Sequence, residues 1–229
     1  MEKRNYNILI IPLIILAMFL FGCESGSEPE DSYGSISFEK QGNPPGGGFD
    51  LGDLTEEEAA GLLYMVEEEK LAHDVYVTFN EMYGEPIFEN ISQSEAAHMR
   101  MVSVKIAKYG LVNPIGENGI GEFVNPEIQE LFNYFVEQGS SSLNDALNVG
   151  GAIEETDIID LWEQLDMLEG NLDIQRVYSN LLNGSKNHLK AFVRVLDFYG
   201  VQYEPQYLTQ EQFDSIMNET PRRKIRRGN

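Results

Sequence analysis

Glu95 and His98, two residue types that bind metal ions, stand three positions apart in a segment whose apolar residues recur with helical spacing. At 3.6 residues per turn, both side chains leave the same face of a helix. The apolar residues Ile91, Val102 and Ile106 continue that face, so the carboxylate and the imidazole are expected to be buried. Burying a neutral polar group without a partner costs roughly 2–7 kcal/mol, and a charge costs more. The pair therefore needs compensation from polar partners on other helices or from a metal ion.

Three other segments with helical spacing carry acids or a histidine on their apolar faces near mid-length. In an antiparallel four-helix bundle, such positions meet at one level of the core. Carboxylates gathered there would repel one another when ionised, and bound divalent cations would neutralise them. The candidate ligands, with the helices predicted to carry them, are Glu69 (55–83), Glu95 and His98 (91–110), Glu154 and Asp157 (143–168) and His188 (172–199).

Cysteine usage and charge limit the chemistry further. Cys23 is the only cysteine, so neither a disulfide nor a thiolate metal site can form within this chain. Any metal would be held by carboxylate and imidazole groups of Glu, Asp and His, which are the harder ligands. The formal charge of −22 argues against nucleic acid as a partner and favours the attraction of cations. A basic tail, 218–229, contrasts with this charge and is expected to be solvated rather than bound to anionic lipid.

Residues next to the candidate ligands have predicted positions of their own. Glu67 and Glu68 fall outside the apolar face of the first helix and are expected on the surface, and Glu155 is expected to point away from the core. A shift in helix register would bring Glu155 inward in place of a neighbouring acid. His73 is expected either to be partly exposed or to lie beside a ligand, rather than to be a ligand itself. The pair Gly150-Gly151 allows either close packing or a kink.

Breaks and short helices complete the predicted domain. Gly84-Glu85-Pro86 ends the first long helix, and residues 111–125 form a glycine-rich connection without a clear period. Short helices are predicted over 126–138 and 209–217. No segment shows a confident period of two, so the sequence predicts an all-α protein.

The first 53 residues are predicted to lie outside the folded domain. Residues 1–22 are predicted to be a signal peptide, with a charged start and an apolar run of about 14 residues, shorter than the roughly 20 that span a membrane. Leu20-Phe21-Gly22-Cys23 resembles a bacterial lipobox, which implies acylation of Cys23. A simple transmembrane anchor is the alternative, and both readings tether an extracytoplasmic domain to the cell membrane or the outer membrane. Residues 23–53, rich in Gly, Ser, Pro and acids, are predicted to be a disordered linker.

Four motifs contain or adjoin the candidate ligands: Glu67-Glu68-Glu69-Lys70-Leu71-Ala72, Phe88-Glu89-Asn90-Ile91, Glu154-Glu155-x-Asp157-Ile158 and Gly184-Ser185-x-Asn187-His188-Leu189. Together they resemble the DUF2202 family, which is assigned to the ferritin-like superfamily. The resemblance covers roughly residues 54–217, the predicted domain. It implies an all-α, ferritin-like four-helix bundle with short additional helices. It also implies a carboxylate–histidine metal site, and an oxidoreductase using iron or manganese with O₂ or peroxide is the leading hypothesis.

One residue departs from the di-iron pattern, which requires a second Glu-x-x-His on the fourth long helix. Ser185 stands three residues before His188, where that pattern has an acid. Asp157 is expected to replace the missing acid; alternatively, the second metal position is weak or absent. A single-metal site, a different metal and a site without metal therefore stay open, as does a homodimer. The alternative function is a lipid-anchored helical binding or scaffold module whose buried polar groups satisfy one another.

Overall fold

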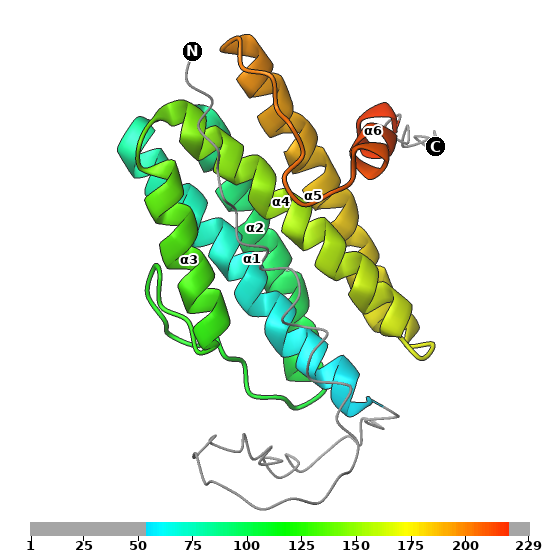
Figure 1. Cartoon of the computed structure of the whole chain (residues 1–229). Coiled ribbons are helices and arrows are strands. Elements are labelled where there is room, and N and C mark those ends of the chain that lie inside the picture. Colours follow the sequence, from blue (N-terminus) through cyan, green and yellow to red (C-terminus); the bar gives the residue numbers. More distant parts are fainter. Residues whose placement is uncertain (1–53, 220–229) are drawn as a thin grey trace, which may run out of the picture. The chain divides into compact units, whose positions relative to one another are not determined.

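Residues 54–219 are described by the structure, a computed structural model, and all their regular elements are helices. The all-α fold predicted from the sequence is confirmed (Figure 1). The predicted signal peptide, Cys23, the predicted linker and most of the basic tail lie outside the described residues. No helix within the described range combines the length and apolarity needed to cross a membrane. The helices are α1 (Glu56–Tyr83), α2 (Pro86–Lys108), α3 (Pro126–Gly139), α4 (Leu143–Met167), α5 (Leu172–Phe198) and α6 (Gln210–Asn218).

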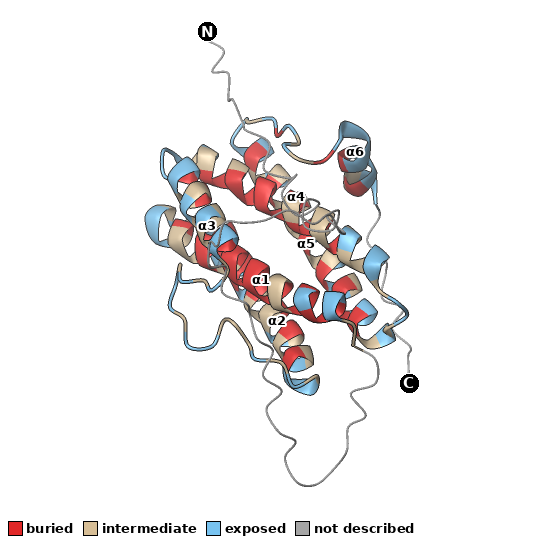
Figure 2. Ribbon diagram, turned by 60° about the horizontal axis from the view of Figure 1, so that its bottom comes forward, coloured by how far each residue is buried: buried red, intermediate tan, exposed pale blue. Residues whose placement is uncertain are grey.

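Four long helices form the bundle, with α1 beside α2 and α4 beside α5 (Figure 1). Short connections make each of these pairs antiparallel: Gly84 and Glu85 join α1 to α2, and residues 168–171 join α4 to α5. The connection from α2 to α4 is long and contains α3, which packs against α1 and α4. Buried residues line the inward faces of the helices, as Figure 2 shows in red.

A layer of polar side chains divides the apolar core of the bundle into two clusters. On α1, Leu62 and Val66 belong to one cluster, and Val75 and Phe79 belong to the other. Glu69 lies between these two stretches and is itself buried. The apolar clusters on either side exclude water from the layer, so its polar groups depend on one another or on a bound ion.

Local sequence explains where the first two helices begin. Thr55 caps α1 in a reciprocal pair with Glu58, whose backbone N–H donates to the Thr55 side chain at 3.1 Å. Gly84 ends α1 with a φ of 63°, a conformation that glycine adopts without strain. The predicted start of α2 near Ile91 is wrong, because the helix begins at Pro86. Proline fits a first helical position, where its missing N–H has no partner in any case.

The paired glycines of α4 allow close packing, and the helix is unbroken from Leu143 to Met167. A Cβ added at Gly150 would lie 2.4 Å from a ring carbon of Phe192, and one added at Gly151 would lie 2.5 Å from the ring of Tyr203. Both distances are too short for real contacts, so only glycine lets these two rings approach α4 so closely.

The prediction that Glu67 lies on the surface is wrong: its side chain is buried under the connection that precedes α3. Its Oε1 accepts hydrogen bonds from the backbone N–H groups of Val124 at 2.6 Å and Asn125 at 3.2 Å. Asp74, two turns along α1, accepts a bond from the N–H of Gly121 at 2.8 Å. The outer face of α1 therefore anchors the glycine-rich connection, which covers it.

Glu155 is also buried, although the sequence pattern predicted that it points away from the core. As predicted, its side chain does not lie on the face of α4 that carries the candidate ligands. It is buried because the segment between α5 and α6 covers it. The carboxylate accepts hydrogen bonds from the Tyr203 hydroxyl at 2.8 Å and from the backbone N–H groups of residues 206, 207 and 208 at 2.6–2.9 Å. One side chain on α4 therefore fixes the segment that leads into α6.

Candidate metal centre

Six candidate side chains from four helices meet in the polar layer between the two apolar clusters. All except His188 are less than a tenth exposed, and the His188 side chain is 12% exposed. They are Glu69 on α1, Glu95 and His98 on α2, Glu154 and Asp157 on α4, and His188 on α5.

Glu95 lies between the two imidazoles. Its Oε2 is 2.6 Å from Nδ1 of His98, and its Oε1 is 2.6 Å from Nδ1 of His188. Two groups of three residues have ligand atoms within 4.8 Å of one another: Glu69, Glu95 and His98 form one triad, and Glu95, Glu154 and His188 form the other. Glu95 belongs to both triads, so one carboxylate could bridge two metal ions.

The two triads resemble each other in geometry. Nδ1 of His98 is 3.1 Å from Glu69 Oε2, and Nδ1 of His188 is 3.4 Å from Glu154 Oε2. The two imidazole rings stack with their centroids 5.5 Å apart. Nε2 of His188 is 2.9 Å from the hydroxyl oxygen of Ser94, an outer hydrogen bond of the kind that orients a ligating histidine.

Several buried oxygen and nitrogen atoms in this layer lack a hydrogen-bond partner. They include Glu69 Oε1, Glu95 Oε1, Asp157 Oδ1 and His188 Nδ1. The close contact between Glu95 and His188 is an ion pair whose groups are not aligned for a hydrogen bond. Folded proteins satisfy most buried polar atoms, so this many in one layer calls for a missing partner. Carboxylate oxygens and imidazole nitrogens are suitable metal ligands, so this set of residues could hold a divalent ion.

Within the protein itself, the charges of the histidines and acids partly balance. Burial alone would lower the pKa of His98, but Glu69 and Glu95 raise it to about 11. At His188, burial would also lower the pKa, but Glu154 and Glu95 raise it to about 10. Burial would raise the pKa of Glu95, but His188 and His98 hold it well below its usual range. Near neutral pH, two imidazolium groups therefore supply the positive charge that metal ions would otherwise bring.

The other acids in the layer are harder to ionise. Burial, followed by the charge of Asp157, raises the pKa of Glu69 well above its usual value. Burial also raises the pKa of Glu154, although His188 opposes it. Burial and the charge of Glu154 raise the pKa of Asp157 to about 8. Two imidazolium groups cannot neutralise all four carboxylates of this layer if every one of them is ionised. A divalent cation bound here would neutralise the rest, so the layer would stabilise such an ion.

Ser185 donates a hydrogen bond to Asp157 Oδ2. The serine that stands where the di-iron pattern has an acid therefore contacts Asp157, the residue expected to replace that acid. Asp157 belongs to neither triad. Its other oxygen, Oδ1, is buried and has no hydrogen-bond partner. The structure thus places Asp157 beside the two triads, with one oxygen held by α5 and the other free to take a ligand.

Two residues that the sequence reading left out of the site support it directly. The Tyr76 hydroxyl, fully buried, donates to Glu154 Oε1 at 2.6 Å. A Cβ added at Gly184 would lie 2.5 Å from Cε1 of His98, so only glycine leaves room for that imidazole. Gly184 is the first residue of the motif Gly184-Ser185-x-Asn187-His188-Leu189. Its place in that motif is the one feature of the sequence that indicates a role at the site. Tyr76 lies on the apolar face of α1 with the spacing of an ordinary packing residue, so the sequence gives no signal of its contact with Glu154.

Two predictions about neighbouring residues have opposite outcomes. His73 is partly exposed, and its Nδ1 lies 2.7 Å from Asp74 Oδ1, away from both triads, as expected for a residue that is not a ligand. Glu68 was predicted on the surface, but it is only 6% exposed. Burial and the charges of Asp160 and Asp157 raise the pKa of Glu68 well above its usual value.

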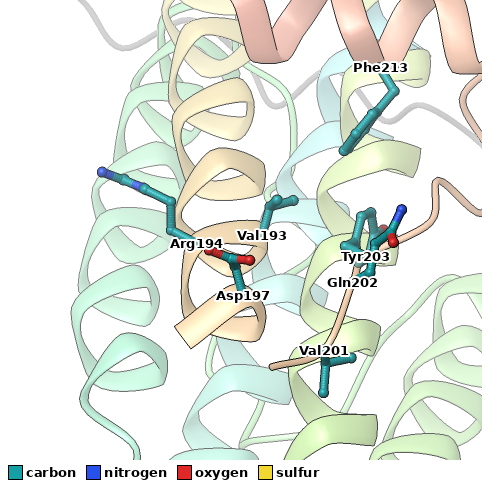
Figure 3. A pocket seen from close by; sticks show the side chains of 7 residues that line it. All are labelled: Val193, Arg194, Asp197, Val201, Gln202, Tyr203 and Phe213. Carbon is teal, nitrogen blue, oxygen red and sulfur yellow. The ribbon is translucent and has the colours of Figure 1, made fainter. Parts of the chain in front are cut away.

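A hollow of about 220 Å³ lies away from the six candidate ligands, between α5, the segment after it and α6 (Figure 3). Val193, Arg194 and Asp197 line it from α5, and Phe213 points into it from α6. None of the candidate ligands lines this hollow. The ligand atoms of each triad lie within 4.8 Å of one another, a spacing that suits a single ion rather than a large organic ligand.

Comparisons with known proteins extend over most of the chain. A family described as "Uncharacterized protein domain (DUF2202)" matches residues 58–220. The "Uncharacterized protein MJ0754" of Methanocaldococcus jannaschii is 44% identical over 174 residues, which cover 76% of this chain and 94% of the relative. The solved "Crystal structure of hypothetical protein MJ0754 from Methanococcus jannaschii DSM 2661" is similar with a TM-score of 0.71 at 44% identity, covering 73% of this chain and 95% of that one.

Proposed function

The chain belongs to the DUF2202 family, as its motifs predicted, and we propose that it is a metal-binding protein whose bundle holds two divalent ions. The observation that carries the proposal is the position of Glu95. Each of its oxygens faces a different imidazole at 2.6 Å, and each imidazole has a second carboxylate close by. A carboxylate between two such triads is arranged to bridge two ions.

The side chains have distinct roles in this proposal. One ion is held by Glu69, Glu95 and His98, and the other by Glu95, Glu154 and His188. Iron or manganese bound there would supply one-electron chemistry toward O₂ or a peroxide.

The surrounding residues prepare the site for such an ion. Tyr76 donates a hydrogen bond to Glu154 and so fixes the direction of that carboxylate. Ser185 fixes one oxygen of Asp157 in the same way. The apolar clusters above and below the polar layer keep water away, which strengthens every electrostatic interaction inside it.

The proposal includes the ferritin-like superfamily and a membrane tether. The support for the superfamily is the order of elements: two antiparallel pairs of long helices joined by one long connection, with inward Glu-x-x-His ligands on α2. The support for the tether is the lipobox-like sequence that ends at Cys23. A chain acylated there would present the metal site outside the cytoplasm, where small oxidants could reach it.

Metal analysis of the purified chain tests the proposal. Protein stripped by a chelator and incubated with Mn²⁺, or with Fe²⁺ without oxygen, is expected to bind about two equivalents. At 100 times the Kd, one bound ion adds about 2.7 kcal/mol and raises the Tm by roughly 5–10 °C. If no metal binds and the Tm is unchanged, the proposal is wrong, and the helical binding or scaffold module becomes the better account.

Two variants on α2 show whether bound metal occupies the proposed site. Glu95→Ala is expected to lose the bound metal and any peroxide consumption by the loaded protein. Glu89→Ala, which changes an exposed acid on the same helix, is the matched control and is expected to behave as the unaltered chain. Full metal binding by Glu95→Ala would show that the metal is held elsewhere.

A further inference from the structure

Acids recur every third residue along α4, and their exposure increases from the metal centre outward. Glu154 is 2% exposed and Asp157 is 7% exposed. Asp160 is partly buried and Glu163 is exposed. Three residues fall short of a full helical turn, so each acid is rotated by about 60° from the one before it. The row of carboxylates therefore winds around α4 from the polar layer to the surface.

Glu68 on α1 lies across from this row. Its strongest charged neighbours are Asp160 and Asp157, and it is next in sequence to Glu69 of the first triad. Its Oε2 is buried without a hydrogen-bond partner, although the residue is only 6% exposed. Asp160, on the outer side, accepts a hydrogen bond from the hydroxyl of the partly buried Tyr64 at 3.2 Å. Glu68 thus connects the partly exposed Asp160 with the acids of the centre.

No basic side chain explains why these two acids are buried together. Among residues 54–219, no lysine, arginine or histidine forms an ion pair with Glu68 or Asp160. The nearby Lys70 pairs with Asp74 and donates to the carbonyl of Gly119 at 2.6 Å. A buried acid with a structural role has a basic partner, as Asp74 has, or backbone N–H donors, as Glu67 has, whereas Oε2 of Glu68 has neither. With one buried oxygen unpartnered and a second acid beside it, Glu68 can offer oxygen ligands to a passing divalent cation.

We propose that Glu68 and Asp160 form the route by which divalent cations pass from the surface to the metal centre. The inference rests on the proposed function, since it needs a metal centre to supply. Glu163 and Asp160 collect the ion, Glu68 takes it inward, and Asp157 and Glu69 receive it. Two carboxylates hold an ion less tightly than a triad with an imidazole does, so the ion stays only briefly on the route and rests in the centre.

The rate of metal uptake tests the route independently of any catalytic activity. Stripped full-length protein is mixed with Co²⁺ in a stopped-flow instrument, and binding is followed by the visible absorption of the bound ion. Asp160→Asn and Glu68→Gln keep the size of each side chain and remove its charge. Each is expected to slow uptake at least about threefold, because charged clefts raise association rates by roughly 10–10³-fold. The final number of bound ions is expected to be the same as in the unaltered chain.

Controls separate this route from a general effect of negative charge. Glu81→Gln removes an exposed acid from α1, the helix that carries Glu68, and is expected to leave the rate unchanged. Thermal melts show which variants fold, and Asp160→Asn, at a partly exposed position, carries the result if Glu68→Gln does not fold. Uptake by Asp160→Asn at the unaltered rate would overturn the route, and so would a lower final number of bound ions, because Asp160 would then be a ligand. If the unaltered chain binds no metal, the proposed function fails, and the route fails with it.

Discussion

Glu95 balances the charges of both halves of the polar layer. It is the only carboxylate in contact with both His98 and His188 among the described residues, and those contacts hold its pKa well below the usual range. Glu69 and Glu154 each contact one imidazole. The three acids are therefore unequal: one is shared between the triads, and the other two are terminal.

The first prediction follows from this inequality. Glu95→Ala is expected to abolish binding of both ions, whereas Glu69→Ala is expected to retain about one ion, held by Glu95, Glu154 and His188. Elemental analysis of the two variants after loading with Mn²⁺ measures the difference. Retention of two ions by Glu95→Ala, or loss of both by Glu69→Ala, would contradict the shared position of Glu95.

Tyr76 supplies the second prediction. Tyr76→Phe removes the hydrogen bond to Glu154 and keeps the packing of the ring. Loss of such an outer bond lowers metal affinity about 10–100-fold, and the unsatisfied buried oxygen costs about 1–3 kcal/mol of stability in the metal-free protein. Titration calorimetry with Mn²⁺ measures the affinity. Tyr199→Phe, at a more exposed hydroxyl bonded to Glu85, is the control and should bind metal normally. An unchanged affinity in Tyr76→Phe would refute the positioning role.

At the scale of the helices, α5 approaches α2 at Gly184, and the third prediction concerns this contact. Alanine in a helix usually stabilises by up to about 1 kcal/mol relative to glycine. Here the added Cβ would lie 2.5 Å from the His98 ring, so Gly184→Ala is expected to displace that imidazole, lower the Tm and weaken metal binding. Asn183→Ala, at an exposed neighbouring position, is the control. Normal metal binding by Gly184→Ala would show that His98 is not a ligand.

Helical periodicity predicted most elements because each long helix has an apolar face interrupted at mid-length. It also predicted which side chains of α1, α2, α4 and α5 face inward at the polar layer. It failed for Glu67 and Glu155, because periodicity identifies one face of a helix and says nothing of what covers the others. The partners of both acids are mainly backbone N–H groups of distant segments, which have no sequence signature. Pro86 was interpreted as a break, although it is also a good first helical residue.

The candidate site was partly predictable for a related reason. Residue type and spacing identified Glu95 and His98, but they could not show that Glu95 is shared by two imidazoles. That fact depends on how α5 is placed against α2. The contact of Ser185 with Asp157 depends in the same way on the packing of α5 against α4. Periodicity therefore identified candidate residues, while their pairing required the packed bundle.

At the scale of the whole molecule, pH should act in opposite directions on the metal-free and the loaded protein. The pKa of His98 rises from the ordinary 6.5 to about 11 and that of His188 to about 10 on folding. A raised pKa adds stability that is complete below the unfolded value and is lost as the pH rises through the folded value. The pKa of Asp157 is raised to about 8, so the stability that this group contributes is also lost as the pH rises, over a lower pH range. The Tm of the stripped protein is therefore expected to fall between pH 6.5 and 9.

Metal binding reverses this trend, because the ion replaces protons on its ligands. The apparent affinity should rise with pH, by up to about tenfold per pH unit for each proton displaced. Calorimetric titrations at pH 6, 7 and 8 in buffers of different ionisation enthalpy measure the protons released. An affinity that does not change over this range would mean that His98 and His188 do not bind the ion.

Anomalous diffraction from crystals of the chain grown with Mn²⁺ tests the central claim most directly. The account predicts two peaks at the manganese absorption edge inside the polar layer. One should be ligated by Glu69, Glu95 and His98, and the other by Glu95, Glu154 and His188. A polar layer without a peak, or with a single ion that Glu95 does not contact, would contradict it.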